Sequence, residues 1–366
     1  MGAAAAPGAA AVAAAMIFRI CWLLSGLTTF ASVSQTPLTL PATLTSDVSV
    51  AVATLQRGGL VALPTETVYG LGANALDERA VAGIFAAKER PAFDPLIIHQ
   101  STAARTLAYA AEVPADARRL ADHFWPGPLT LVLPKGERVP DLVTAGLPTV
   151  ALRVPAHPVA RAVLAAVDFP VAAPSANPFG FVSPTRPEHV LAQLGDRIDL
   201  VLDGGPCAVG LESTIVSFTD GRATVLRKGG LPVEDLAGFL GYAPTVRTHS
   251  DSRPEAPGML SRHYSPGNRL EIFPQLTAAT PAPPRSAWIT FGPWNTDGRI
   301  AVPPTVTLFS LSPDGDLAEA AQQLFGLLRL MAERAYDYVA VQALPERGLG
   351  RAINDRLRRA AVPPKP

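Results

Sequence analysis

The chain of 366 residues has only two cysteines, Cys21 and Cys207, and they lie far apart in the sequence. This scarcity excludes a disulfide framework and a CxxC metal-binding pair, and it favours a reducing, cytoplasmic compartment. The chain also lacks an excess of charge, because 31 Lys and Arg residues balance 31 Asp and Glu residues. A protein whose main task is nonspecific binding of nucleic acid usually carries a basic excess, so any contact with RNA is expected to be weak.

Glycine-rich phosphate loops of the Walker and GxGxxG kinds are missing, which argues against a standard kinase or dehydrogenase. The sequence has no internal repeat and no His, Cys and Asp cluster at the spacing of a protein-held metal site. The apolar segment near the N-terminus is interrupted by Arg19 and Ser25, and it is shorter than the ~20 apolar residues of a membrane span. We therefore expect no membrane partner.

Short apolar runs alternate with amphipathic segments along most of the chain, and 37 prolines and 29 glycines indicate many turns. We expect helices at residues 45–58, 77–87, 101–111, 114–124, 159–167, 187–194 and 232–240, and strands at 59–63, 95–98, 129–133, 146–154, 171–174, 200–203, 212–218 and 223–227. Strands that alternate with helices predict an α/β domain with a mixed, twisted sheet. Strands at 287–291 and 339–342 and helices at 317–335 and 352–360 predict a smaller, doubly wound domain after it.

Composition divides the chain into four expected parts. Residues 1–35 are a low-complexity, alanine-rich extension. We interpret it as a disordered segment, or as sequence that comes from a start codon assigned too far upstream, rather than as an export signal. Residues 36–242 form the first domain and residues 270–366 the second. Residues 243–269 are polar, rich in proline and without periodicity, which is typical of a linker.

Residues 63–99 bring hydroxyls, glycines and cations together. An apolar run ends at Pro64, and small residues that predict a ligand-approaching turn follow at Thr65, Thr67, Gly70 and Gly72. Lys88 and Arg90 come directly after a predicted helix, and two cations opposite a hydroxyl-rich turn suit a nucleoside triphosphate. On residue types alone, solvated charges at a helix end are the favoured explanation, since a helix C-terminus favours cations by roughly 0.3–1 kcal/mol.

Polar residues also stand at the ends of other predicted strands, which is where open α/β sheets usually bind ligands. They are His99, Arg153, Ser175, Asn177, Ser213 and Arg227. Each has an ordinary structural explanation: Ser and Asn form turns, an arginine pairs with a carboxylate, and a lone histidine is usually just hydrogen-bonded. Residue types alone favour the structural explanation for the Ser175-x-Asn177 turn, for His99 and for Ser213.

The PTETVYGLG sequence at 64–72, the Lys88-x-Arg90 pair followed by Pro91, and the Ser175-x-Asn177 turn occur in that order. Together they resemble the YrdC-like family, in particular the two-domain threonylcarbamoyl-AMP synthases. The resemblance extends to PGMLSRHYSP at 257–266 and GLGRAINDRLRRAA at 348–361. It implies a YrdC-like twisted mixed-sheet domain followed by a smaller Rossmann-like α/β domain.

The activity implied by the resemblance is formation of threonylcarbamoyl-AMP and pyrophosphate from L-threonine, bicarbonate and ATP. A partner transferase would then modify adenosine in tRNA, and Mg²⁺ would be carried with ATP rather than held by the protein. The resemblance makes Lys88 and Arg90 catalytic. It assigns threonine to Thr67, His99, Arg153, Ala173 and Ser213, and the nucleotide to Arg90, Asp94, Thr149, Ser175, Asn177, Ser183, Arg227 and Tyr264, the last as a lid.

One departure from the family concerns Asp94, where the relatives often have Asn. An ionised Asp cannot donate a hydrogen bond, so its contact with phosphate would need a bridging Mg²⁺ or water. Three other functions stay open at this point. They are an RNA-binding module of the same fold, a threonine or nucleotide sensor without catalysis, and a carbamoyl-phosphate-dependent enzyme of metal-centre maturation, whose CxxC pairs are missing here.

Overall fold

The structure is a computed structural model that describes residues 41–247, 255–259, 264–265, 267–294 and 301–362. The expectation for residues 1–35, and the parts of the expected linker at 248–254, 260–263 and 266, lie outside these residues. In the described part the strands of the larger sheet are β1 (Thr43–Thr45), β2 (Val61–Leu63), β3 (Gly70–Asn74), β4 (Ile97–His99), β5 (Leu129–Pro134), β6 (Thr149–Arg153), β7 (Val171–Ala172), β8 (Leu200–Leu202), β9 (Thr214–Ser217), β10 (Thr224–Arg227) and β11 (Thr245–Val246).

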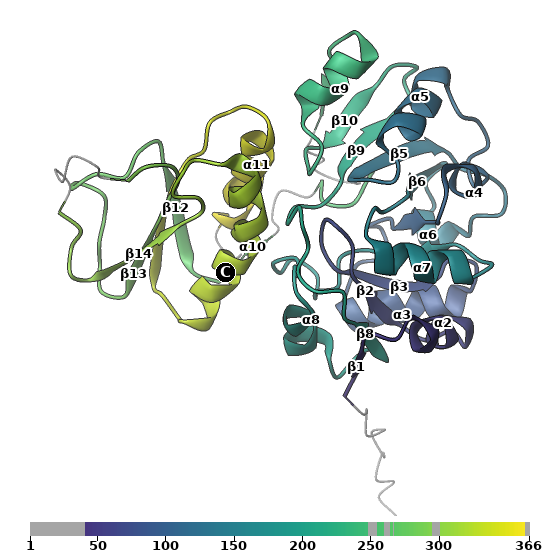
Figure 1. Cartoon of the computed structure of the whole chain (residues 1–366), viewed down its shortest axis with the longest axis horizontal. Helices are drawn as coiled ribbons and strands as arrows, with labels where there is room; N and C mark the ends of the chain where they lie inside the picture. Colours follow the sequence, from purple (N-terminus) through teal and green to yellow (C-terminus); the bar gives the residue numbers. More distant parts are fainter. Residues whose placement is uncertain (1–40, 248–254, 260–263, 266, 295–300, 363–366) are drawn as a thin grey trace, which may run out of the picture. The chain divides into compact units, whose positions relative to one another are not determined.

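These strands are ordered β1-β8-β2-β3-β7-β4-β6-β5-β9-β10-β11. The pairing is mixed: β4 runs parallel to β6, for example, whereas β7 runs antiparallel to β4. The helices of this part are α2 (Val48–Gln56), α3 (Glu78–Lys88), α4 (Ala103–Leu107), α5 (Ala115–Phe124), α6 (Asp141–Thr144), α7 (Pro158–Ala166), α8 (Pro187–Leu194) and α9 (Val233–Leu240) (Figure 1). The predicted mixed α/β sheet is thereby confirmed.

Helix α3 shows how local sequence positions the site. Asp77 caps its N-terminus, because the carboxylate accepts hydrogen bonds from the backbone N–H groups of Arg79 and Ala80. Its apolar residues, among them Ile84, are buried in the main hydrophobic core. The helix ends at Glu89, which adopts the left-handed conformation with φ of 53°. This turn stops the helix one residue before Arg90.

The glycines of the PTETVYGLG sequence were expected in a turn, and the structure corrects this. Gly70 and Gly72 belong to strand β3, which pairs antiparallel with β2. A Cβ atom on Gly72 would lie 3.0 Å from side-chain atoms of Leu63 and Val171. Gly72 is therefore needed for tight packing inside the sheet, whereas Gly70, although it belongs to the strand, lines the cavity described below.

The smaller sheet has the order β12-β15-β13-β14, with all neighbours parallel. Its strands are β12 (Arg269–Phe273), β13 (Ser286–Thr290), β14 (Val306–Ser310) and β15 (Tyr338–Gln342), and its helices are α10 (Leu317–Glu333) and α11 (Leu349–Ala360). One buried cluster joins Leu324 and Ile353 of these helices to Val68 and Tyr264.

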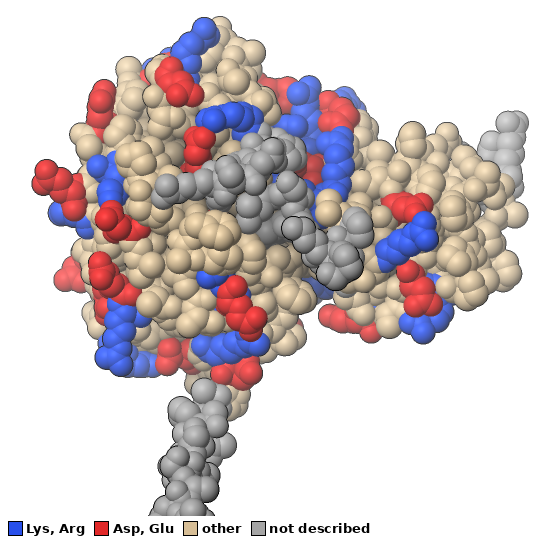
Figure 2. All heavy atoms as spheres, turned by 180° about the vertical axis from the view of Figure 1, so that it is seen from behind, with Lys and Arg blue, Asp and Glu red and all other residues tan. Residues whose placement is uncertain are grey.

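On the face drawn in Figure 2, acidic and basic side chains are interspersed.

Candidate active site

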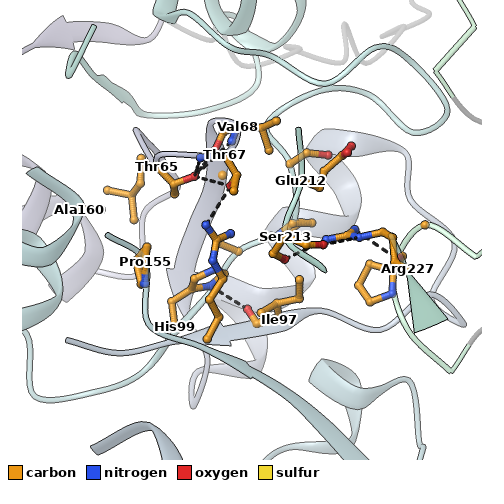
Figure 3. A pocket seen from close by; sticks show the side chains of 18 of the residues that line it. Thr65, Thr67, Val68, Ile97, His99, Pro155, Ala160, Glu212, Ser213 and Arg227 are labelled. Atoms are coloured by element: carbon orange, nitrogen blue, oxygen red, sulfur yellow. Dashed lines mark hydrogen bonds between the residues drawn. The ribbon is translucent and has the colours of Figure 1, made fainter. Parts of the chain in front are cut away.

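A cavity lies where several strands of the larger sheet end. His99 closes β4 and Arg153 closes β6, and the parallel register of these strands sets the two residues opposite each other. Ala173 follows β7, and its backbone N–H donates to the carbonyl of Ile97. Figure 3 shows Thr65 and Thr67 on one side of the cavity, His99 on another, and Ser213 with Arg227 on a third. The sheet topology thus gathers residues that are far apart in the sequence.

Many of the residues assigned from the sequence line this cavity. They are Thr67, Arg90, His99, Arg153, Ala173, Ser175, Ser213, Arg227 and Tyr264. The others, namely Lys88, Asp94, Thr149, Asn177 and Ser183, are not among the lining residues. Thr149 stands at the opposite end of β6 from Arg153, and four residues of extended strand separate them by about 13 Å.

Arg153 is almost fully buried and is held by neighbours from the turn at 64–69. Its Nη2 donates to Oε1 of Glu66 at 2.7 Å and to the hydroxyl of Thr67 at 2.9 Å. The second carboxylate oxygen of Glu66 accepts from the backbone N–H of Ala156 at 3.0 Å. Within the described residues Nη1 makes no hydrogen bond, which leaves that edge of the guanidinium for a ligand. Glu66 was missed from the sequence, although it lies inside the motif.

Arg227 and Ser213 form a second polar wall. Nε of Arg227 donates to the carbonyl of Ser213 at 3.0 Å, and Nη2 donates to its hydroxyl at 3.0 Å. That hydroxyl is also 2.7 Å from the hydroxyl of Thr130. Burial lowers the pKa of Arg227 to about 10, in spite of the opposing effect of Glu212. The guanidinium therefore remains cationic at neutral pH.

Arg90 supplies a third guanidinium to the cavity and is paired with Asp94. Its Nη2 lies 2.9 Å from Oδ2 of Asp94, and both side chains are buried. The other oxygen of Asp94, Oδ1, is buried without a hydrogen-bond partner in the described residues. Burial raises the pKa of Asp94 even though Arg90 and Lys88 oppose this. Asp94 is the ion-pair partner of Arg90 and is not among the residues that line the cavity.

Lys88 lies behind the 175–177 turn and points towards it. Its ammonium donates to the carbonyl of Ser175 at 2.5 Å and to the carbonyl of Asn177. The side chain of Asn177 in turn donates to the carbonyls of Pro178 and Phe181. Burial and then the nearby Arg90 lower the pKa of Lys88 well below its usual range. In this arrangement Lys88 fixes the backbone that presents Ser175 to the cavity.

Replacing Lys88 with Met is expected to lower the free energy of unfolding by about 1–3 kcal/mol. The substitution fills the same space but removes the donor to the carbonyls of Ser175 and Asn177; the Ser175 carbonyl keeps the backbone N–H of Asn177 as a donor. Urea denaturation followed by circular dichroism measures the change. Lys135→Met is the control, because Lys135 pairs with Asp141, whose side chain is 80% exposed, and such pairs contribute at most about 1 kcal/mol. Equal stability of the two variants would contradict the anchoring role.

Tyr264 is buried and lines the cavity from the linker segment. Its ring stacks on Phe325 of α10 with centroids 5.4 Å apart, and the guanidinium of Arg356 lies 5.5 Å from the ring centroid. Gly258 has a φ of +80°, and a Cβ there would lie 3.2 Å from Cδ of Arg227. This glycine lets the linker backbone approach Arg227 closely, beside the tyrosine hydroxyl.

His99 is buried beside Arg153 and contacts the carbonyl of Ile97 through Nδ1 at 3.1 Å. Burial, followed by the charge of Arg153, lowers its pKa to about 3. A neutral imidazole is therefore present throughout the physiological range. It can donate or accept a hydrogen bond to a substrate without carrying charge.

The low pKa of His99 predicts an acid-sensitive fold. Between pH 6.5 and 3 an unfolded chain would bind a proton at this residue that the folded chain does not, so stability falls as the pH falls. His99→Gln should remove this loss, which amounts to about 1.4 kcal/mol per pH unit. Urea unfolding at pH 7, 6 and 5 tests this. Parallel pH dependence of the two proteins would argue against a neutral, buried His99.

In the described residues no group of three or more His, Cys, Asp or Glu side chains is arranged to hold a metal ion. Among the same residues, no helix is long and apolar enough to cross a membrane.

Comparisons with known proteins identify the family of this chain. Residues 53–229 match the Sua5/YciO/YrdC family model, described as telomere recombination, and residues 231–362 match the model described as the threonylcarbamoyl-AMP synthase C-terminal domain. The threonylcarbamoyl-AMP synthase of Pyrococcus abyssi is 40% identical over 329 residues, covering 86% of this chain and 94% of that protein. That of Bacillus subtilis is 38% identical over 320 residues, covering 86% and 92%.

A solved structure is similar over the same span. The crystal structure of P. abyssi Sua5 complexed with L-threonine superposes with a TM-score of 0.77 at 36% identity, covering 88% of this chain and 98% of that one. The similarity therefore includes both sheets and the residues between them. The chain belongs to the threonylcarbamoyl-AMP synthase family in its two-domain form.

Proposed function

We propose that this protein is an L-threonylcarbamoyladenylate synthase, a nucleotidyltransferase that makes threonylcarbamoyl-AMP and pyrophosphate from L-threonine, bicarbonate and ATP. The observation that carries the proposal is the cavity at the strand ends, where Arg90, Arg153 and Arg227 converge. It occurs in a chain 40% identical to a threonylcarbamoyl-AMP synthase over most of its length. The downstream use would be threonylcarbamoyladenosine modification of tRNA by a partner transferase.

The reaction needs two anions to meet. The amine of threonine adds to bicarbonate with loss of water and gives a carbamate. A carbamate oxygen then attacks the α-phosphorus of ATP, and the bond from that phosphorus to the leaving pyrophosphate breaks. Guanidinium groups reduce the repulsion between the reactants and stabilise the charge that develops on the phosphates. Holding both reactants in one cavity also removes association entropy, which can contribute about 7–11 kcal/mol of the barrier.

Arg153 is proposed to bind the carboxylate of threonine, so that only the carbamate is free to react. Its orientation is set by Glu66 and Thr67 before substrate arrives, and such preorganisation limits the entropy lost on binding. His99 lies beside it, Ser213 lines the same cavity, and these two residues would recognise the substrate amine and hydroxyl. Arg90, Ser175 and Arg227 would hold the nucleotide. Lys88 and Asn177 would act through the backbone that carries Ser175.

Mg²⁺ is proposed to enter with ATP. This ion keeps several waters and is usually bound through substrate phosphates and one or two carboxylates. Asp94, the carboxylate next to Arg90, is buried and is not among the residues that line the cavity, so we assign the ion no protein ligand. We further propose that residues 36–242 form the catalytic domain, 243–269 a linker and lid, and 270–366 an accessory domain.

The direct test is to incubate the protein with ATP, Mg²⁺, bicarbonate and labelled L-threonine and to look for a labelled adenylate. The proposal predicts threonine-dependent pyrophosphate release and a product with the mass of threonylcarbamoyl-AMP. Threonine binding by isothermal titration without any consumption of ATP would favour the sensor instead.

Tyr264 is proposed to cover the nucleotide and keep water from the product, which is a labile mixed anhydride. Tyr264→Ala should therefore raise the ratio of AMP to intact adenylate several-fold while pyrophosphate release continues. Tyr264→Phe keeps the ring against Phe325 and serves as the control. Product ratios by anion-exchange chromatography report the effect, and an unchanged ratio in Tyr264→Ala would rule out the covering role.

A further inference from the structure

The cavity proposed to bind anions also contains a buried carboxylate. Glu212 lines it next to Ser213 (Figure 3) and is only 5% exposed. A negative charge at this position would repel both the phosphates of ATP and the carboxylate of threonine. The charge must therefore be balanced from within the protein, and the balance is supplied from a distant part of the sequence.

Arg356 of helix α11 provides that balance. Its Nε and Nη2 both donate to Oε2 of Glu212 at 3.1 Å, and its own side chain is 0% exposed. The other oxygen of Glu212 accepts a 2.8 Å hydrogen bond from the hydroxyl of Ser183. Burial alone would raise the pKa of Glu212, but Arg356, Arg227 and Ser183 outweigh it and lower the pKa to about 2. The pair is thus ionised and closed to water.

The same guanidinium also touches the proposed lid. Arg356 lies over the ring of Tyr264 at 5.5 Å, while Phe325 of α10 stacks with that ring at 5.4 Å. Nη1 of Arg356 bonds Asp355 at 3.0 Å, which fixes the guanidinium on its own helix. The Arg356 side chain of helix α11 therefore contacts both Glu212, in the cavity wall, and Tyr264, the proposed lid.

We propose that Arg356 is a positioning residue of the active site, which neutralises Glu212 so that anionic substrates bind. This inference rests on the proposed function, because it assigns a task in ATP binding. It gives the smaller domain a role in the reaction: its last helix completes the charge balance of a cavity formed by the larger sheet. A buried carboxylate left without its partner carries a heavy penalty, so removal of Arg356 harms the site more than removal of the whole pair.

A double-mutant cycle tests this through the KM for ATP and kcat of pyrophosphate release. Arg356→Met should raise KM at least tenfold with a smaller change in kcat. Glu212→Gln alone leaves Arg356 paired with Asp355 and should raise KM less than Arg356→Met does. The double variant Glu212→Gln/Arg356→Met should return KM to within threefold of wild type, because neither charge remains. Should Arg356→Met fail to fold, the double variant still decides the question.

The matched control is Arg351→Met on the same helix. Arg351 also pairs with a glutamate of the first part of the chain, Glu234, but both side chains are about two-fifths exposed. Its KM for ATP should stay within twofold of wild type. An active wild type with KM still raised tenfold in the double variant would show that Arg356 is only structural and would overturn the inference. A wild type that neither binds nor consumes ATP would overturn the proposed function, and this inference with it.

Discussion

Replacing Arg153 with alanine is expected to weaken the binding of L-threonine by about two orders of magnitude. The guanidinium is the cation that stands beside His99 at the ends of adjacent parallel strands. Truncating one partner of a buried, hydrogen-bonded charge pair costs about 2–5 kcal/mol, and each 1.4 kcal/mol corresponds to tenfold in Kd. Part of the loss would come from Glu66, which the substitution leaves buried without its arginine. Isothermal titration with L-threonine measures the effect.

Two further variants make this result specific. Arg161→Ala removes an exposed arginine from α7 and should leave the Kd for threonine unchanged. Arg153→Ala/Glu66→Gln removes the stranded carboxylate as well. If Arg153 binds the threonine carboxylate, the double variant stays at least tenfold weaker than wild type. Recovery of wild-type affinity in the double variant would mean that Arg153 serves only to neutralise Glu66.

Replacing Arg90 with alanine is expected to slow threonine-dependent pyrophosphate release by about 10²–10³-fold. Arg90 lines the cavity and is preoriented by Asp94 and by the carbonyls of Asp94 and Pro95. Preorganised donors aimed at developing charge typically contribute a factor of this size to kcat. A coupled assay for pyrophosphate, run at saturating ATP and threonine, measures the rate.

The control for Arg90 is its near neighbour in space, Arg197. That side chain pairs with Glu89, the residue before Arg90, but the pair is largely exposed. Arg197→Ala should keep the wild-type rate within about twofold, as expected for a surface ion pair. Arg90→Ala/Asp94→Asn removes the unpaired carboxylate and should remain slow. A wild-type rate in either Arg90 variant would contradict the electrostatic role of Arg90.

Local signals predicted much of the fold. Helix α8 has the predicted bounds of 187–194, and α3 differs from its prediction by a single residue at each end. Both begin with strong local features, a proline in the first turn and an aspartate cap. Strand β3 was missed because its glycines carry no side-chain pattern, although tight packing against Leu63 and Val171 requires them.

The sequence predicted many of the residues that line the cavity, but it did not predict the contacts that several of them make. His99 and Arg153 were found because each ends an apolar run, and adjacent parallel strands bring such ends together. The glutamates that pair with Arg153 and Arg356 were not found. Glu66 is 87 positions from Arg153, and Glu212 is 144 positions from Arg356. Pairs at this separation depend on the order of strands and on the position of α11, which no local pattern reports.

The central claim is that the arginines of one cavity hold both anionic reactants next to each other. A crystal structure of the protein with L-threonine and a non-hydrolysable ATP analogue tests it most directly. We predict the threonine carboxylate at about 2.7–2.9 Å from Arg153 and phosphate oxygens at a similar distance from Arg90. Either ligand bound outside this cavity, or a threonine carboxylate turned away from Arg153, would contradict the account.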